Sequence, residues 1–376
     1  MYWQKTYERQ DILMTLNNTY QLDLPKNGLL GSLLLYIYGA QATGLGQTGG
    51  KFKIADYISK LEIIADGSKV IKSLTGKQAQ AIGFLDAGVT MPDMVRMYAT
   101  NEQRAHFTLN FGRYLQDVDY GLDLSRWKNV EIRITNDATN TYYSTLYVSI
   151  MSYYLRDGAV GQFKGYIASE NWREWVPVAS ETKYLELPTD YLIRRIILNP
   201  YPGFDGTTNK WYDSLNNLMY GIELTFNTGS DWVWKDGFYR LMVCNYLERG
   251  VYNLVSAETY LTADYAADIG LGYYQGIVAS DASKDDAAAT LVATLEADTT
   301  SNIPKMENYE ADTTVNMLAM GYGYQQCASF NFDGDSNPST WLDTKQKDVV
   351  KLDITTRSTA TVTSAKNRVV LERLVR

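Results

Sequence analysis

Hydrophobic and polar residues along the chain follow one pattern twice. Residues 22–40 read LDLPKNGLLGSLLLYIYGA, and residues 185–203 read LELPTDYLIRRIILNPYPG. At an offset of 163, a proline falls on a proline, and seven leucines of the first stretch fall on leucine or isoleucine in the second. The leucine spacing also suits one face of a helix, but Gly31 weakens a helix, and Pro200 and Pro202 come early in the second copy. We therefore expect a strand after a proline-led turn in each half of a duplicated chain.

Further predicted strands recur at matching places in the two halves. Residues 61–71 read as two strands around an Asp-Gly turn, a strong hairpin signal, and residues 222–233 are their counterpart at an offset of 162. Later, residues 128–135 read KNVEIRIT and residues 348–355 read DVVKLDIT, at an offset of 220. Their alternating apolar positions are typical of a half-buried strand.

A helix is predicted between these strands in each half. Thr75 and Gln78 form a capping box, and Gly88 ends the first helix. The second copy, residues 236–250, also ends on a glycine at the same offset of 162. Capped helices are common, but one at the same place in both halves supports duplication.

The growth of the offset from 162 to 221 locates an insertion of about 59 residues in the second copy, over about residues 252–326. We divide the chain into a first domain, 1–160, and a second, 161–376. Residues 1–20 are expected to form an arm or short helix that leads into the first domain. The aromatic-rich segment 156–182 is expected to pack on the body of the protein.

Many short strands with turn signals, one helix in each repeat and long loops predict an all-β protein. At this strand count, we expect two tandem eight-stranded jelly rolls, each with a short helix in a loop. The second jelly roll carries the long insertion.

This organisation resembles the double jelly-roll major capsid proteins of tailless icosahedral viruses, often with an internal membrane, a lineage that includes adenoviruses. Residues 22–30 and 67–79 are similar to its phage branch. The resemblance implies a structural protein: three copies form a pseudo-hexagonal capsomer that tiles an icosahedral shell. It implies contacts with other copies, neighbouring capsomers, pentons and minor capsid proteins. The chain is much shorter than adenovirus-type subunits, so their very large outer loops should be absent.

Composition agrees with two globular domains in 376 residues, of which 45% are hydrophobic. The first ten residues carry charges where a signal peptide would be apolar, and no apolar run approaches the roughly 20 residues that span a bilayer. We expect a soluble protein made in the host cytoplasm and located in the virion capsid.

Few residues are available for catalysis. His106, the only histidine, lies in an alternating strand and is expected near the surface, which excludes a multi-histidine metal site. Cys244 and Cys327 are expected to be buried thiols. No nucleophile elbow, Walker loop or dinucleotide fingerprint is present. We predict no catalytic, cofactor-binding or metal-binding residue, and no cofactor.

Two polar motifs allow a second interpretation. Asp333, Asp335 and Asn337 have the spacing that begins a calcium loop, but Pro338 replaces its glycine and Thr344 its bidentate glutamate. A plain Asx-rich turn is preferred.

Arg194 and Arg195 interrupt an apolar run. They could bind phosphate, but a subunit interface or a solvated position is preferred.

Two other function classes stay open. The 30 tyrosines and eight tryptophans could stack on sugars in a glycan-binding tandem β-sandwich, such as a viral spike or receptor-binding protein. A jelly-roll glycoside hydrolase would need two carboxylates about 5–10 Å apart. We prefer a structural protein that is not an enzyme.

Charge separates the insertion from the rest. It holds eleven acidic residues and two lysines, a net −9, whereas the whole chain carries −8. We expect the insertion to lie on the outer face of the capsid, either as a solvated loop or as a host contact, with a short helix at 285–296.

The chain has no polybasic arm, so no direct nucleic-acid binding is expected. Residues 1–16 and 366–376 are candidates for inner-face contacts. The basic residues of the tail, Lys366, Arg368, Arg373 and Arg376, would suit anionic lipid headgroups.

Overall fold

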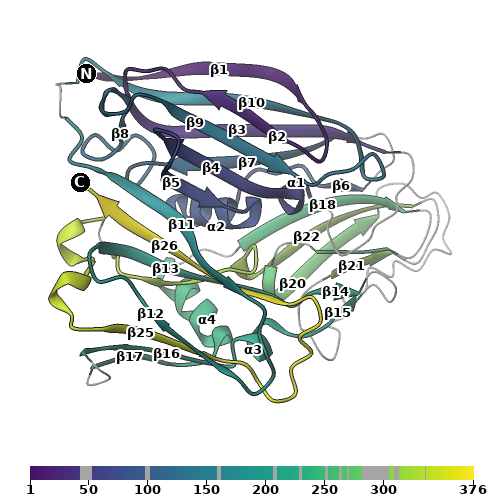
Figure 1. The fold of residues 1–376 in the computed structure, drawn as a ribbon. Coiled ribbons are helices and arrows are strands. Elements are labelled where there is room, and N and C mark those ends of the chain that lie inside the picture. The colour runs from purple at the N-terminus through teal and green to yellow at the C-terminus, as the bar shows by residue number, and fades with distance from the viewer. Residues whose placement is uncertain are drawn as a thin grey trace.

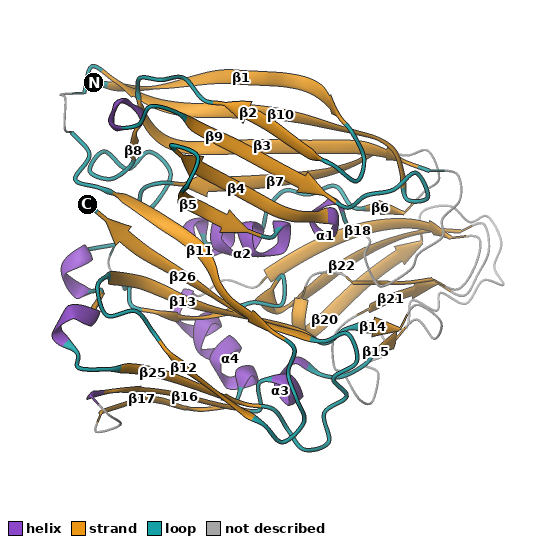
Figure 2. Ribbon diagram, viewed as in Figure 1, coloured by secondary structure: helices purple, strands orange, loops and turns teal. Residues whose placement is uncertain are grey.

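The protein consists of two β-sandwiches packed side by side, with a further sheet at one end (Figures 1 and 2). The computed structural model describes these residues: 1–42, 53–97, 102–158, 162–205, 210–227, 231–249, 253–261, 265–268, 271–281, 305–308, 313–334 and 336–376.

The first sandwich has two sheets, one of which extends into the second sandwich. One sheet has the order β1 (Tyr2–Met14), β10 (Tyr143–Arg156), β3 (Leu29–Gln41) and β7 (Glu102–Asn110), and the short β8 (Leu122–Asp123) pairs with β3. The facing strands have the order β2 (Thr19–Asp23), β9 (Val130–Asn136), β4 (Ile58–Ala65) and β5 (Lys69–Leu74).

The second sandwich repeats this order strand by strand. One group is β11 (Tyr166–Trp175), β26 (Lys366–Val375), β13 (Leu192–Tyr201) and β23 (Ala328–Asn331), with β24 (Leu342–Asp343) paired to β13. The other is β12 (Thr182–Glu186), β25 (Val350–Thr355), β16 (Gly221–Phe226) and β17 (Asp231–Asp236). Eight main strands in each half, in the same order, confirm the predicted pair of jelly rolls.

The predicted local elements are present. In the 22–40 stretch, strand β3 begins at Leu29 after the turn that holds Pro25, and the predicted hairpins are β4–β5 and β16–β17. The first helix is α2 (Gly76–Ala87): Thr75 accepts a hydrogen bond from the Gln78 amide, and Gly88 follows with a left-handed φ of 72°. The second is α4 (Phe238–Arg249), whose expected stop at residue 250 lies outside the described residues.

One expectation was wrong because it concerned a segment that pairs with a distant strand. Residues 1–20 form no arm or short helix. They hold β1, which pairs with β10 from Tyr2 to Met14, and the start of β2. Segment 156–182 packs on the body of the protein, as expected, and contains β11, a strand between β26 and β5.

The described residues also hold more than one helix per repeat. The shorter helices are α1 (Ile54–Tyr57), α3 (Leu215–Leu218), η1 (Leu124–Arg126), η3 (Pro338–Thr340) and η4 (Thr344–Gln346). None of the helices in the described parts of the chain has the length and apolar character to cross a bilayer.

The insertion contributes strands that form their own sheet. Its described strands are β18 (Asn253–Leu261), β19 (Tyr265–Asp268), β20 (Leu271–Asp281), β21 (Lys305–Asn308) and β22 (Thr313–Tyr324). The sheet has the order β20-β22-β18-β6, and β6 (Arg96–Met97) comes from the first jelly roll. Nearby, β14 (Phe204–Asp205) pairs with β15 (Lys210–Trp211). The helix expected at 285–296 lies outside the described residues.

Two features join the jelly rolls. Strand β5 pairs in parallel with β11, with Lys72 opposite Ser169 and Ser73 opposite Glu170, so that one nine-stranded sheet runs through both halves. In addition, Ile197 and Val370 of the second jelly roll belong to the apolar core cluster of the first. A second core cluster lies between the sheets of the second jelly roll.

Candidate functional site between the jelly rolls

Two consecutive arginines on β13 point into the contact between the jelly rolls. Side chains alternate along a regular strand, so neighbours normally face opposite ways. Here the pairing of β13 with β26 shifts register between Ile193 and Arg195, which leaves Arg194 as the extra residue of a β-bulge. A bulge redirects side chains, and both arginines are buried, with exposed fractions of 2% and 0%.

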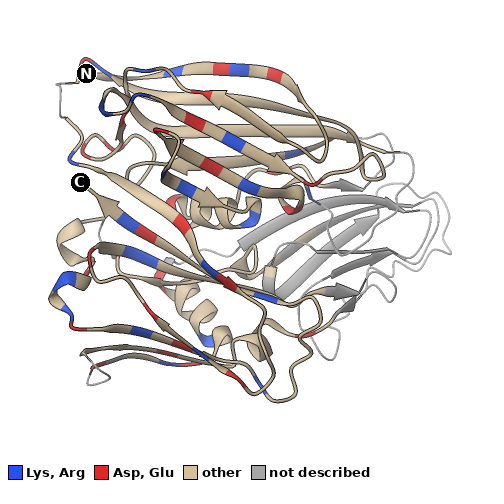
Figure 3. Ribbon diagram, viewed as in Figure 1, with Lys and Arg blue, Asp and Glu red and all other residues tan. Residues whose placement is uncertain are grey.

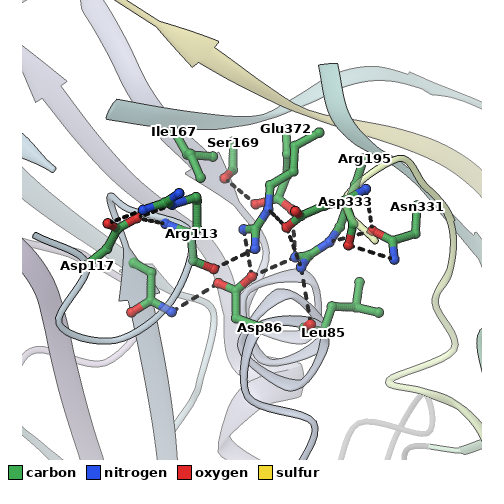
Figure 4. A network of polar contacts seen from close by, with 12 residues as sticks. Leu85, Asp86, Arg113, Asp117, Ile167, Ser169, Arg195, Asn331, Asp333 and Glu372 are labelled. Atoms are coloured by element: carbon green, nitrogen blue, oxygen red, sulfur yellow. Dashed lines mark hydrogen bonds and ion pairs between the residues drawn. The ribbon is translucent and has the colours of Figure 1, made fainter. Parts of the chain in front are cut away.

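Three carboxylates surround the two guanidinium groups (Figure 4). Asp86 Oδ1, from helix α2 of the first jelly roll, accepts from Arg194 Nη1 at 2.7 Å and from Arg195 Nη1 at 2.6 Å. Asp333 Oδ2 lies 2.7 Å from Arg194 Nε, and Glu372 Oε2 lies 3.0 Å from Arg195 Nη1. Asp86 is thus the residue through which both arginines hold the two halves together.

A buried lysine completes the charge balance. Lys72 Nζ, on β5, donates to Ser169 Oγ at 3.0 Å, and Ser169 Oγ donates to Glu372 Oε1 at 3.0 Å. Three cations and three anions thus lie in one network. We call Lys72, Asp86, Arg194, Arg195, Asp333 and Glu372 the junction network.

Neutral groups satisfy remaining positions of the junction network. Asn110 Nδ2 donates to Asp86 Oδ2 at 3.0 Å, and Trp341 Nε1 donates to Asp333 Oδ1 at 3.0 Å. The carbonyls of Leu85 and Arg113 accept from Arg195 and Arg194. Buried charges are tolerated when they are paired and hydrogen-bonded, as the two arginines and the three carboxylates are here.

The protonation states follow from these contacts. Burial alone would raise the pKa of Asp86, but the charges of Arg194 and Arg195 outweigh it and hold that pKa below its ordinary value. Burial lowers the pKa of Lys72 to about 8. Asp86 therefore stays ionised at neutral pH. It cannot act as the protonated carboxylic acid that a glycoside hydrolase needs.

The expectation for Arg194 and Arg195 was therefore wrong. Both are fully enclosed within one chain, so neither a solvated position nor a surface phosphate site fits. They form an interface, but between the two jelly rolls and not between subunits.

The described residues of the Asp333–Asn337 motif have separate structural roles. The Asp333 carboxylate is engaged by Arg194 and Trp341. Asn337 Oδ1 accepts from the Ser339 amide, which makes an Asx turn at the start of η3. Asp335 lies outside the described residues. Within the residues that the structure does describe, no three His, Cys, Asp or Glu side chains form a group suited to a metal ion.

The other candidate residues occupy ordinary positions. His106 lies on β7, and its ring centroid is 4.9 Å from that of Tyr36. Cys327 is buried, which raises the pKa of its thiol to about 12, whereas Cys244 is only half-buried. Neither cysteine forms a disulfide.

The basic residues of the C-terminal tail lie mostly in a strand, and their contact with lipids stays a prediction. Residues 366–375 form β26, which lies between β11 and β13. Lys366 and Arg368 form ion pairs with Glu174 at 2.8 and 2.7 Å, and Arg373 pairs with Glu170 at 2.7 Å. These three cations are engaged within the sheet.

Comparison with known proteins adds evidence about the fold. As a sequence, the chain matches no protein-family model and no curated protein. As a structure, it is similar to the MCP of STIV, Sulfolobus Turreted Icosahedral Virus, with a TM-score of 0.60 at 11% identity over 99% of this chain and 97% of that one. It is also similar to the major capsid protein P2 from bacteriophage PM2 (TM-score 0.51, 10% identity, 100% and 98% covered). A chain of the PBCV-1 virus capsid gives 0.53 at 11% identity, with 100% and 94% covered.

These similarities extend over nearly the full length of both chains, so they cover the two jelly rolls together. At such low identity they establish the fold. The expected likeness to double jelly-roll capsid proteins is confirmed at that level, and the chain has a double jelly-roll fold.

Proposed function

We propose that this protein is a structural major capsid protein whose homotrimer forms a pseudo-hexagonal capsomer of an icosahedral virus shell. The observation that carries the proposal is the strand-by-strand repetition of one jelly roll within a chain. Three such chains present six similar bodies, so that a three-fold assembly fills a six-fold position in a lattice.

The junction between the jelly rolls supports this proposal. A capsomer of six similar bodies needs the two bodies of each chain at a fixed spacing. The β5–β11 pair and the junction network fix that spacing through groups from both halves. The chain is proposed to act by assembly and to have no enzymatic activity.

The proposed partners are other copies of the chain, neighbouring capsomers, pentons and minor capsid proteins, and lipids of an internal membrane through residues outside β26. Direct nucleic-acid binding is not proposed. Figure 3 shows acidic and basic residues interspersed along the strands of both jelly rolls. Phosphate backbones attract concentrated positive charge, which the net −8 does not favour.

The acidic insertion is proposed to lie on the outer face of the capsid. Its described strands gather at one end of the molecule, beside β6 (Figure 1). Limited proteolysis of assembled particles tests this placement. Early cleavage within residues 252–326 is expected, and protection of that segment while the jelly rolls are cut would contradict it.

Mass in solution tests the function. Light scattering of the purified chain should give three times the 42.5 kDa of one chain. A monomer that binds defined oligosaccharides on a glycan array would instead favour the glycan-binding alternative. A monomer at all concentrations tested would refute the capsomer proposal.

A further inference from the structure

A cavity of about 320 Å³ lies at the end of the molecule that is farther from the insertion. Residues 121–127, which include β8 and η1, form one wall, and the start of β11 with the end of β26 forms another. Figure 1 shows β8 and the C-terminal end of the chain on the side away from β18, β20 and β22. The cavity is large enough to hold a small ligand.

Three cations and one carboxylate line this cavity. The cations are Lys69 at the start of β5, Arg126 in η1, and Arg376. The carboxylate is that of Asp123. Its Oδ1 accepts from the amide and the hydroxyl of Ser125 at 3.1 and 2.6 Å, and its Oδ2 lies 3.7 Å from Arg126 Nε. Because this carboxylate is engaged in capping η1, the cavity keeps an excess of positive charge.

Two of these cations have no counter-charge within the chain. Among the residues that the structure describes, the side chains of Lys69 and Arg376 form neither an ion pair nor a hydrogen bond. The basic side chains of β26, in contrast, are paired with glutamates. Charges of one sign around a cavity concentrate ligands of the opposite sign. The cavity is therefore suited to an anion.

The cavity is also lined by a residue whose polar group lacks a partner. Tyr166 is only 7% exposed, and its enclosed hydroxyl has no hydrogen-bond partner in the described parts of the chain. Burial raises the pKa of this hydroxyl, although the charge of Arg373 opposes the shift, so the group stays protonated and can donate. A buried hydroxyl without a partner costs free energy. A ligand oxygen that accepted its hydrogen bond would offset that cost.

The aromatic walls of the cavity are held in place. The rings of Trp127 and Tyr166 meet edge to face, with centroids 6.4 Å apart. The Phe163 ring lies against Gly121, where a Cβ would come within 2.4 Å of it. The Gly121 amide donates to the Gly165 carbonyl at 2.9 Å. Walls that are fixed before a ligand arrives lower the entropic cost of binding.

The second jelly roll lacks this concentration of positive charge. The capped turns η1 and η4 correspond at an offset of 220, so Gln346 and Lys347 occupy the places of Arg126 and Trp127. Asp231 begins β17 as Lys69 begins β5. A jelly roll thus forms in this chain with an amide and an acid in place of two of the cations. The fold itself does not require those cations, which points to a ligand as their role.

We propose that this cavity binds the phosphate group of a small ester or of a phospholipid headgroup. Lys69, Arg126 and Arg376 supply the positive charge, and the Tyr166 hydroxyl donates to a phosphate oxygen. The amphipathic ring of Trp127 packs on the carbon atoms next to the phosphate. With the insertion on the outer face, as proposed above, this end of the chain faces the inside of the capsid.

Two probes test the site and distinguish the sources of the phosphate. Titration calorimetry with glycerol 3-phosphate measures a soluble ester. Flotation with vesicles of phosphatidylcholine and phosphatidylglycerol in equal parts measures a headgroup at a surface. The Lys69→Gln, Arg126→Gln variant should bind the probe that wild type binds at least about tenfold more weakly, because two cations next to a phosphate are lost. Its melting temperature should change little, since both side chains are exposed.

The matched control is Lys183→Gln, Lys351→Gln. It makes the same change in net charge at exposed positions of β12 and β25. The control should bind as wild type does. Binding of glycerol 3-phosphate without vesicles would support the site with a soluble ligand. Binding of the anionic vesicles alone would support it with a lipid headgroup.

Tyr166→Phe separates a binding role from a structural one. The variant loses only a hydroxyl that has no partner in the described residues, so its stability should be unchanged or slightly higher. Its binding of the phosphate probe should weaken at least about tenfold, because a hydrogen bond to a charged group is lost. A variant that is less stable and binds as wild type does would count against the proposal.

Three other results would overturn the inference. These are a wild type that binds neither probe, equal losses in the test and control variants, and tighter binding of single-stranded DNA through Lys69 and Arg126. The cavity is formed by one chain, so these results would leave the proposed capsomer untouched. A chain that failed to form trimers would, in turn, leave the test of the cavity valid.

Discussion

The two jelly rolls share one strand order but differ in what covers equivalent surfaces. Helix α2 is covered by the second jelly roll and carries Asp86 into the junction network, whereas the same face of α4 is exposed. The internal contact contains buried ion pairs, which need complete pairing to be tolerated. At the equivalent position of β3, glycine and serine replace the arginines. Duplication thus provides two copies of each surface. In this chain, one copy of each surface is buried in the contact between the two jelly rolls.

The largest effect on the free energy of unfolding is expected for the buried charges of the junction network. Asp86→Asn should lower the free energy of unfolding by about 3–5 kcal/mol, because two buried arginines lose a shared carboxylate. Glu248→Gln, at the exposed counterpart, should change it by less than about 0.5 kcal/mol. Denaturant titration measures both.

The pH dependence sharpens that comparison. Because the pKa of Asp86 is lowered in the folded protein, its contribution is complete above its ordinary value of 3.8 and is lost as the pH falls through the folded value. The advantage of wild type over Asp86→Asn should therefore shrink in acid. An equal cost for Asp86→Asn and Glu248→Gln would contradict the contrast.

A leucine pair tests packing instead of charge. Leu85→Ala should cost about 2–4 kcal/mol, since a buried side chain is removed and leaves a cavity. Leu247→Ala should leave the unfolding of the monomer nearly unchanged, because the side chain is 71% exposed. Thermal melts at a concentration below trimer formation separate the two. Comparable losses would show that α4 is covered within the chain.

Lys72 offers a test in alkaline solution. Its pKa is about 8 when folded against an ordinary 10.5, so the unfolded chain binds more protons between these values. The free energy of unfolding of wild type, relative to Lys72→Met, should therefore rise from pH 8 to 10.5, by on the order of 2 kcal/mol. A flat difference across that range would mean that Lys72 is solvated.

The smallest effect concerns the ion pairs of β26. Glu174 pairs with Lys366 and Arg368 at a partly exposed position, and these cations keep its pKa low although burial opposes them. Glu174→Gln should cost less than about 1 kcal/mol, and high salt should reduce the cost. Unchanged binding to anionic vesicles in this variant agrees with a β26 integrated in the sheet. Strong vesicle binding by wild type that depends on Arg368 would contradict the integration of β26 in the sheet.

The repeat could be predicted because strand alternation, prolines, caps and turns are local signals. Pro25 and Pro188 match at an offset of 163, and Gly67 and Gly88 match Gly229 and Gly250 at an offset of 162. Another local signal was missed. The Leu-Asp pairs at 122–123 and 342–343 share the offset of 220, and each aspartate caps a short helix, η1 or η4.

The junction could not be predicted in the same way, because it depends on distant pairing. Asp86 and Arg194 are 108 residues apart, and Glu372 is 177 from Arg195. The direction of the arginines depends on a bulge that only the pairing of β13 with β26 creates. One signal was available: arginines inside the apolar run LIRRIIL could not be buried without carboxylate partners. Which carboxylates pair with these arginines could be known only from the fold.

Electron microscopy of the purified protein tests the central claim most directly. Class averages of single particles should show three-fold rings with six lobes of nearly equal size, at the mass of three chains. Each of the three chains would supply two adjacent lobes, one for each jelly roll. Two-lobed monomers, or rings with another number of lobes, would contradict the claim that the duplicated jelly roll builds a pseudo-hexagonal capsomer.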